Sequence, residues 1–271
     1  MNVVLLELEG TAFFCAVPGR PFCRQGARFR KNSWRERKMK GLFLVLEGGD
    51  GSGKSSQIAL LRDFFKKAGR KTATIHFPRL AVAPYGPLIA EFLRGEFGSV
   101  DNVHPKLAAL IYALDRGQAA AQLRERLAAG EVILADRYLF SNIAYQCAKV
   151  ADPAERQRLA DWIEKLEYGS HAIPRPALTL YLDVPPEFSR AKLAEARSGP
   201  DRDYLQGARD IHEDSRELQD NVRAQFLHLA KTRSGEIGLV DCRAADAGMA
   251  DKKTIHSRIV DALRYYGVIA R

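Results

Sequence analysis

The sequence predicts an α/β fold in which helices cover both faces of a five-stranded parallel sheet. Short apolar runs alternate along the chain with longer segments whose apolar residues recur at helical spacing. The first run enters a glycine-rich loop that precedes a helical segment, and the third run ends on an aspartate. This alternation favours a parallel sheet, because parallel neighbours need a crossover connection between them.

The expected strands are short and apolar, as buried parallel strands are. In chain order they occupy residues 42–46, 72–77, 131–135, 177–184 and 237–240. Pro78 closes the second strand, because a proline cannot donate a hydrogen bond to a neighbouring strand. The carboxyl ends of five parallel strands meet at one edge of the sheet, where α/β proteins bind their ligands.

Helices are expected in the intervals between the strands and after the last one. They occupy residues 56–67, 86–94, 105–129, 140–150, 153–168, 186–196, 210–231 and 251–266. Gly130 ends the long third helix, in the position that glycine favours. The fifth helix is entered from Asp152 as N-cap, with Pro153 at the first helical position. Residues 197–209 are polar and irregular, so they interrupt the pattern.

The net charge of +9 is concentrated near the N-terminus. Residues 1–40 contain nine Lys or Arg against three Asp or Glu, which leaves only +3 for residues 41–271. A nearly balanced domain is not expected to bind nucleic acid. No apolar run reaches the about 18 residues of a membrane helix. The four cysteines are scattered without metal-binding spacing. We therefore expect a cytoplasmic protein with reduced thiols and no membrane partner.

Residues 1–38 differ from the rest of the chain. Glu7 and Glu9 stand where a secretion signal would be basic, and the following basic segment shows no steady helix or strand period. The segment Met39-Lys40-Gly41 runs directly into the first strand, which favours Met39 as the natural start. We expect residues 1–38 to be a disordered extension that arose from start-site choice, and residues 41–271 to form the folded domain.

A loop of the form G-x-x-x-x-G-K-S follows the first strand at residues 48–55. Its glycines let backbone N–H groups turn inward around an anion, and the next helix places its positive end behind them. Lys54 can reach the β- and γ-phosphates of a nucleotide, and the Ser55 hydroxyl can hold Mg²⁺. The residues expected to bind the nucleotide are Gly48, Gly49, Asp50, Gly51, Ser52, Gly53, Lys54, Ser55 and Ser56.

Charged residues at other strand ends are expected at the same edge. Asp136 ends the third strand, where a carboxylate can help Ser55 to hold Mg²⁺, although an aspartate here can also cap the next helix. Arg79, Arg116 and Arg137 come from three segments. Converging guanidinium groups suit a phosphate-bearing acceptor, although each arginine alone could be a surface group.

Together these motifs resemble the thymidylate (dTMP) kinase family over essentially all of residues 41–271. The phosphate loop E-G-G-D-G-S-G-K-S-S-Q, the segment F-P-R at 77–79 and the helix L-I-Y-A-L-D-R at 110–116 are similar to family motifs. The most specific match is D-R-Y-L-F-S-N-I-A-Y-Q at 136–146. The resemblance implies a P-loop nucleoside monophosphate kinase fold with a short lid, and transfer of the γ-phosphoryl of ATP to dTMP with Mg²⁺.

The resemblance also implies roles at the phosphate end of the acceptor site. Asp50 would lie between the acceptor phosphate and Mg²⁺, and Lys54 would neutralise the transferred phosphoryl group. Arg79 and Arg137 would bind the phosphate of dTMP.

At the base end, the resemblance implies that Tyr112 stacks on thymine, although it could instead be a core aromatic. Stacking of this kind is worth roughly 1–3 kcal/mol. Arg116 would hydrogen-bond the thymine edge, and Asn142 would read the base beside it. Tyr145 would pack near the deoxyribose and disfavour a 2′-hydroxyl.

Residues 197–209 resemble the lid that closes over ATP. Some family members carry a catalytic arginine in the phosphate loop, where this chain has Gly51, so the lid should supply it. We favour Arg197 and Arg202 over Arg209 for this role. Asp210 and Glu213 match a family pattern near the metal, or are acids in the first turn of a helix. A homodimer is expected from the resemblance alone.

Two other classes of protein also contain a phosphate loop of this kind. Another deoxynucleotide or deoxynucleoside kinase shares the loop, but a nucleoside kinase needs a base near the 5′-hydroxyl, usually a Glu after the second strand, where this chain has Arg79. A nucleotide-switch protein such as a GTPase needs an N-K-x-D motif, which the chain lacks. The choice between dTMP and dUMP as acceptor stays open.

Overall fold

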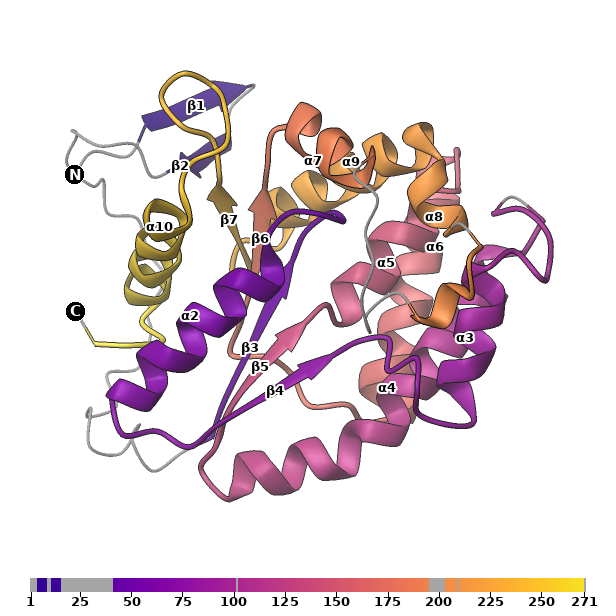
Figure 1. Ribbon diagram of the computed structural model, residues 1–271, viewed down its shortest axis with the longest axis horizontal. Coiled ribbons are helices and arrows are strands. Elements are labelled where there is room, and N and C mark those ends of the chain that lie inside the picture. Colours follow the sequence, from indigo (N-terminus) through magenta and orange to yellow (C-terminus); the bar gives the residue numbers. More distant parts are fainter. Residues whose placement is uncertain are drawn as a thin grey trace.

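The computed structural model describes residues 4–8, 11–15, 41–100, 102–194, 203–208 and 210–270. A five-stranded, all-parallel sheet in the order β4-β5-β3-β6-β7 lies at its centre (Figure 1). The strands are β3 (Leu42–Glu47), β4 (Thr72–His76), β5 (Val132–Asp136), β6 (Leu178–Asp183) and β7 (Ile237–Asp241). The predicted fold class is therefore confirmed, and each predicted strand matches an observed one to within one residue at either end.

Helices cover both faces of the sheet (Figure 1). On one face lie α2 (Lys54–Lys67) and α10 (Lys252–Tyr265), and on the other α4 (Pro105–Ala128), α5 (Leu139–Cys147), α6 (Pro153–Glu164) and α9 (Arg216–Thr232). Successive side chains of β3 point to opposite faces of the sheet. Leu44 and Leu46 pack in the core that contains α2, and Phe43 and Val45 pack in the core that contains α4 and α5. A strand that is buried on both faces must be apolar at nearly every position, as residues 42–46 of β3 are.

The remaining elements of the domain are shorter. They are α3 (Tyr85–Leu93), the π-helix η1 (Lys165–Ser170), α7 (Pro186–Ala194), the 3₁₀-helix η2 (Asp203–Leu205) and α8 (Ile211–Asp214). Parallel pairing of β3 with β5 places Leu46 opposite Asp136, and pairing of β4 with β5 places His76 opposite the same aspartate. The ends of three strands are therefore adjacent where the phosphate loop begins.

Two predicted helices are divided in the structure. The segment 153–168 consists of α6 followed by η1, and the segment 210–231 consists of α8 and α9 with Ser215 between them. Ser215 is extended (φ −93°, ψ 105°), and its hydroxyl accepts a hydrogen bond of 3.2 Å from the N–H of Leu218. A serine that caps a new helix leaves the helical conformation, which explains the break.

Within residues 1–38 the structure describes two strands, β1 (Val4–Leu8) and β2 (Thr11–Cys15). They pair antiparallel, with Val4 opposite Cys15, and β2 lies beside β7. That residues 1–38 form an extension to the folded domain stays a prediction, and the rest of this segment lies outside the described residues. Among the helices of the described ranges, none is both long and apolar enough to cross a membrane.

Candidate active site

A cavity of about 1510 Å³ opens along the carboxyl edge of the sheet. Residues 50–56 of the phosphate loop line it, together with residues from β4, α4, β5 and α5. The sequence-predicted acceptor residues that line the same cavity are Asp50, Arg79, Tyr112, Arg116, Arg137, Asn142 and Tyr145. The tertiary structure therefore brings the loop and all three predicted arginines to one cavity.

The loop has the conformation that its glycines permit. Gly51 and Gly53 have φ of +73° and +83°, in the left-handed region that side chains disfavour. A Cβ on Gly51 would also lie 2.8 Å from the Cβ of Lys192. Gly53 directly precedes α2, so the positive end of that helix faces the loop.

Lys54 is held inside the loop. Its ammonium donates hydrogen bonds to the carbonyl oxygens of Gly48 (3.1 Å) and Gly49 (2.9 Å). Burial, and next the charge of Arg137, lower the pKa of Lys54, against the attraction of Asp136 and other carboxylates. A lysine fixed at this point presents its charge to whatever phosphate the loop binds.

The two residues predicted to hold a metal ion lie close together. The Ser55 hydroxyl lies 3.4 Å from Oδ2 of Asp136, and Oδ1 of Asp136 is buried without a hydrogen-bond partner among the described residues. Burial would raise the pKa of Asp136, but the charge of Lys54 and the contact with His76 outweigh it and lower the pKa. The N-cap of α5 is Tyr138, so the helix-capping alternative for Asp136 is wrong. Hard oxygen ligands of this kind fit Mg²⁺.

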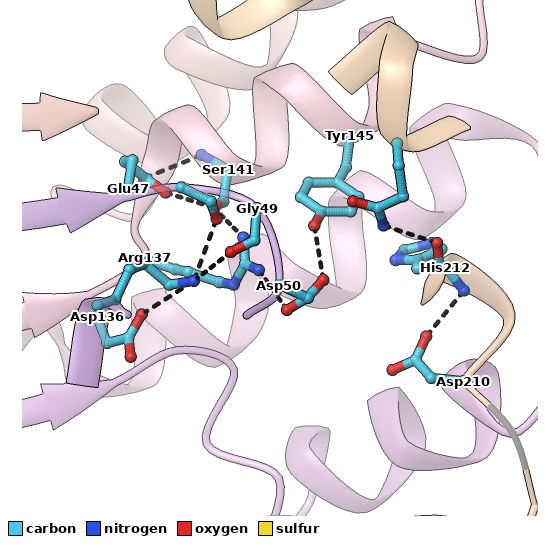
Figure 2. Close-up of polar contacts among 12 residues, drawn as sticks. Glu47, Gly49, Asp50, Asp136, Arg137, Ser141, Tyr145, Asp210 and His212 are labelled. Atoms are coloured by element: carbon cyan, nitrogen blue, oxygen red, sulfur yellow. Dashed lines mark hydrogen bonds and ion pairs between the residues drawn. The ribbon is translucent and has the colours of Figure 1, made fainter. Parts of the chain in front are cut away.

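Arg137 connects the loop to α5 (Figure 2). Its Nη2 donates to Oδ1 of Asp50 at 2.7 Å and its Nη1 to the hydroxyl of Ser141 at 3.2 Å. The guanidinium lies 5.3 Å from the ring centre of Tyr145, whose hydroxyl donates to Oδ2 of Asp50 at 3.1 Å. Burial would raise the pKa of Asp50, but the charges of Arg137 and Lys54 outweigh it and hold the pKa well below its usual range.

Arg79 is fixed against α4. Its backbone N–H and Nε donate to the carboxylate of Asp115 at 3.0 and 2.9 Å, and its Nη2 donates to the Asp115 carbonyl and to Gln118 at 2.6 and 2.7 Å. The side chain therefore has a defined position at the cavity wall. Asp115 was not singled out from the sequence, although it directly precedes Arg116 in the family-like helix motif.

Arg116 has a partner that the sequence analysis missed. It is 2% exposed and donates through Nε and Nη2 to both carboxylate oxygens of Glu167, at 2.5 and 2.7 Å. Nδ2 of Asn142 donates to the same carboxylate at 2.8 Å and to the carbonyl of Ala109 at 3.0 Å. Oδ1 of Asn142 is then a buried acceptor with no partner in the described part of the chain.

Tyr112 contributes an aromatic face to the cavity and packs edge-on against Phe92, with ring centres 6.4 Å apart. It belongs to a small core cluster between α3 and α4. Packing in a core cluster agrees with the core-aromatic alternative, and base stacking by the cavity-facing part of the ring stays a prediction.

Two further residues of the cavity wall were not assigned a definite role from the sequence. His212 stacks on Tyr145 (ring centres 5.2 Å apart), and burial, followed by the charge of Lys149, holds the pKa of His212 well below its usual value. Asp210 accepts from the hydroxyl of Tyr204 (2.8 Å) and from the N–H of His212 (2.8 Å). Burial, followed by the charge of Asp50, raises the pKa of Asp210 to about 6. Asp210 is thus the N-cap of α8, one position before the first turn in which the sequence alternative placed it, and it also lines the cavity.

The predicted lid residues Arg197, Arg202 and Arg209 lie outside the residues that the structure describes. Glu213, the other acid of the D-x-x-E pattern, lines the cavity.

A parallel α/β sheet with a phosphate loop and arginine–carboxylate pairs along one cavity defines a nucleotide kinase of the P-loop class. Comparison with known proteins narrows this class. The family model for thymidylate kinase matches residues 46–245. The chain is 31% identical over 208 residues to the thymidylate kinase of Mycobacterium tuberculosis, which covers 76% of this chain and 94% of that protein. It is 36% identical over 205 residues to the thymidylate kinase of Clavibacter sepedonicus, covering 75% and 88%.

The solved structure of thymidylate kinase from Candida albicans has the same fold, with a TM-score of 0.63 and 26% identity over 84% of this chain and 93% of that one. The chain belongs to the thymidylate kinase family.

Proposed function

We propose that the protein transfers the γ-phosphoryl group of ATP to the phosphate of dTMP, giving ADP and dTDP. The observation that carries this proposal is that Lys54 and the Arg137–Asp50 pair face one cavity. Phosphoryl transfer depends on positioning and charge neutralisation more than on covalent chemistry, so two adjacent cationic phosphate sites are the essential requirement.

On the donor side, the loop amides and Lys54 would bind the ATP phosphates. Ser55 and Asp136 would hold Mg²⁺, which when bound neutralises charge on the phosphate oxygens. The described residues contain no cluster of three metal-ligating side chains. This agrees with Mg²⁺, which is commonly bound by one or two protein oxygens together with waters and substrate phosphates.

On the acceptor side, Arg137 and Arg79 would bind the dTMP phosphate. Their carboxylate partners support this role, because Asp50 and Asp115 hold the two guanidinium groups in place before substrate arrives. The remaining N–H groups of the two guanidinium groups can then donate to a dianionic phosphate.

The base end is suited to thymine. The face of Tyr112 can stack on the ring, and the buried acceptor Oδ1 of Asn142 matches the N3–H donor of thymine. Arg116 would donate to a carbonyl of the base, with its charge already balanced by Glu167. Tyr145, held through Asp50 near the sugar, would disfavour a 2′-hydroxyl.

The lid and the quaternary structure belong to the same proposal. Arg197 or Arg202 would add positive charge at the γ-phosphate, since Gly51 occupies the loop position where other members carry an arginine. A homodimer is proposed from family membership, and light scattering after size exclusion would measure it; a monomer at all accessible concentrations would contradict it.

A coupled assay of ADP release with ATP and Mg²⁺ tests the main proposal. We expect turnover with dTMP and none with deoxythymidine, which lacks the phosphate for Arg79 and Arg137. The rate with dUMP, measured in the same assay, decides the preference between the two monophosphates. Preference for deoxythymidine would indicate a nucleoside kinase. Acceptor-independent GTP hydrolysis without turnover of any monophosphate would indicate a switch protein.

A further inference from the structure

Glu47 is a completely buried carboxylate beside the active-site cavity, and it is absent from the cavity wall. It ends β3, and the alternation of that strand points its side chain toward α5. Oε1 of Glu47 accepts hydrogen bonds from the N–H groups of Tyr138 (2.9 Å) and Ser141 (3.0 Å). Oε2 accepts from the Ser141 hydroxyl at 2.5 Å, and Figure 2 shows Glu47 beside Ser141. Tyr138 provides no side-chain cap for α5, so Glu47 caps this helix from a different strand.

The same carboxylate holds the backbone of Arg137 in an unfavourable conformation. Arg137 has φ of 64°, in the left-handed region that residues with a Cβ atom disfavour. Its own N–H donates to the carbonyl of Leu46 at 2.9 Å, and the next N–H, that of Tyr138, donates to Glu47. Two consecutive residues of β3 therefore fix both peptide groups that flank Arg137.

Glu47 also orients the side chain of Arg137 through Ser141. A hydroxyl has one proton, and the proton of Ser141 is donated to Oε2 of Glu47. The lone pairs of Ser141 are then available to Nη1 of Arg137 at 3.2 Å, while Nη2 of the same group reaches Asp50. With Glu47 as acceptor, hydrogen bonds to Ser141 and Asp50 hold both terminal nitrogens of the guanidinium group.

We infer that Glu47 is the positioning residue of the acceptor site, and that it acts through Ser141 and the Tyr138 N–H to aim Arg137 at the acceptor phosphate. The inference rests on the proposed function for the identity of the acceptor. Because Glu47 does not line the cavity, it takes no direct part in binding either nucleotide.

Glu47→Gln keeps the size of the side chain but places an NH₂ group at one position where an acceptor is required. When this NH₂ group faces Ser141, it donates to the Ser141 hydroxyl. The hydroxyl proton then no longer points to residue 47 and turns toward Arg137. Ser141→Ala removes the hydroxyl but leaves the two backbone hydrogen bonds to Glu47, so it tests the same relay with less risk to folding. We expect the KM for dTMP to rise about tenfold in both variants and the KM for ATP to stay within about twofold.

Asp183→Asn is the matched control. Asp183 is a buried carboxylate at the end of β6 that binds Arg223 through two hydrogen bonds of 2.7 and 2.9 Å, away from the cavity wall. Its loss should lower the melting temperature without a selective change in the KM for dTMP. Equal changes in both KM values for Glu47→Gln and Ser141→Ala, as from general destabilisation, would overturn the inference.

A crystal structure of each variant gives a readout that does not depend on turnover. We expect the guanidinium of Arg137 to leave Asp50 or to occupy several positions. An unchanged Arg137 in Ser141→Ala, or in Glu47→Gln where that variant folds, would refute the relay. Lack of turnover by the wild-type protein with dTMP would instead refute the proposed function, so the two failures are distinguishable.

Discussion

Replacing Lys54 with Met removes one charge from the phosphate loop and keeps most of the side-chain volume. Lys54 is buried, donates to two loop carbonyls and lies 3.9 Å from Oδ1 of Asp136. Loss of a single uncharged donor to a developing negative charge typically lowers kcat by about 10²–10³, and charge-assisted bonds are roughly twice as strong. We therefore expect kcat to fall by at least about 10³.

Binding of dTMP should respond differently, because its proposed phosphate ligands are Arg79 and Arg137. Lys54 is the second of the two cations that lower the pKa of Asp50, after Arg137, so its loss weakens the acceptor site only indirectly. Calorimetric titration should give a dissociation constant for dTMP within about threefold of the wild-type value, a loss below about 0.7 kcal/mol.

The assay compares ADP release by Lys54→Met with that by Lys67→Met. Lys67 is exposed at the far end of α2, so its replacement removes the same charge without changing the loop. The reasoning fails if kcat of Lys54→Met stays within about tenfold of wild type, or if its affinity for dTMP falls as steeply as kcat.

Three further results are expected. Tyr112→Leu, which retains packing against Phe92, should raise the KM for dTMP by up to about two orders of magnitude through lost stacking; a rise in the KM for ATP alone would place the acceptor elsewhere. Asp136→Asn should shift the Mg²⁺ dependence of turnover to about tenfold higher concentration, and an unshifted titration would exclude Asp136 from the metal site. The pKa of Asp210 is raised in the folded state, so protonation of Asp210 favours folding at low pH. This contribution to the free energy of unfolding, about 3 kcal/mol, is lost as pH rises from about 4 through about 6. The melting temperature of Asp210→Asn relative to wild type should therefore increase over that range, whereas a constant difference would show that Asp210 does not titrate there.

The acceptor arginines show how far sequence reasoning extends. The motifs placed Arg79, Arg116 and Arg137 at one cavity, because each follows or faces a strand end on the same edge of a parallel sheet. The motifs did not reveal that every one of these guanidinium groups already has a carboxylate partner. Arg116 in particular is buried against Glu167, which lies in a π-helix that the helical pattern merged with α6.

Local sequence determined the phosphate loop, the strands and most helices of this protein. A loop of eight contiguous residues and a strand of five carry their own conformational signals in glycine placement and in periodic burial. Which side chains contact one another, in contrast, depends on the packing of distant segments. Glu47 and Ser141 are 94 positions apart, Arg116 and Glu167 are 51 apart, and Arg79 and Asp115 are 36 apart. A buried charge needs a partner, but no periodic pattern specifies where along the chain that partner will be found, because strand order and helix packing set the distance.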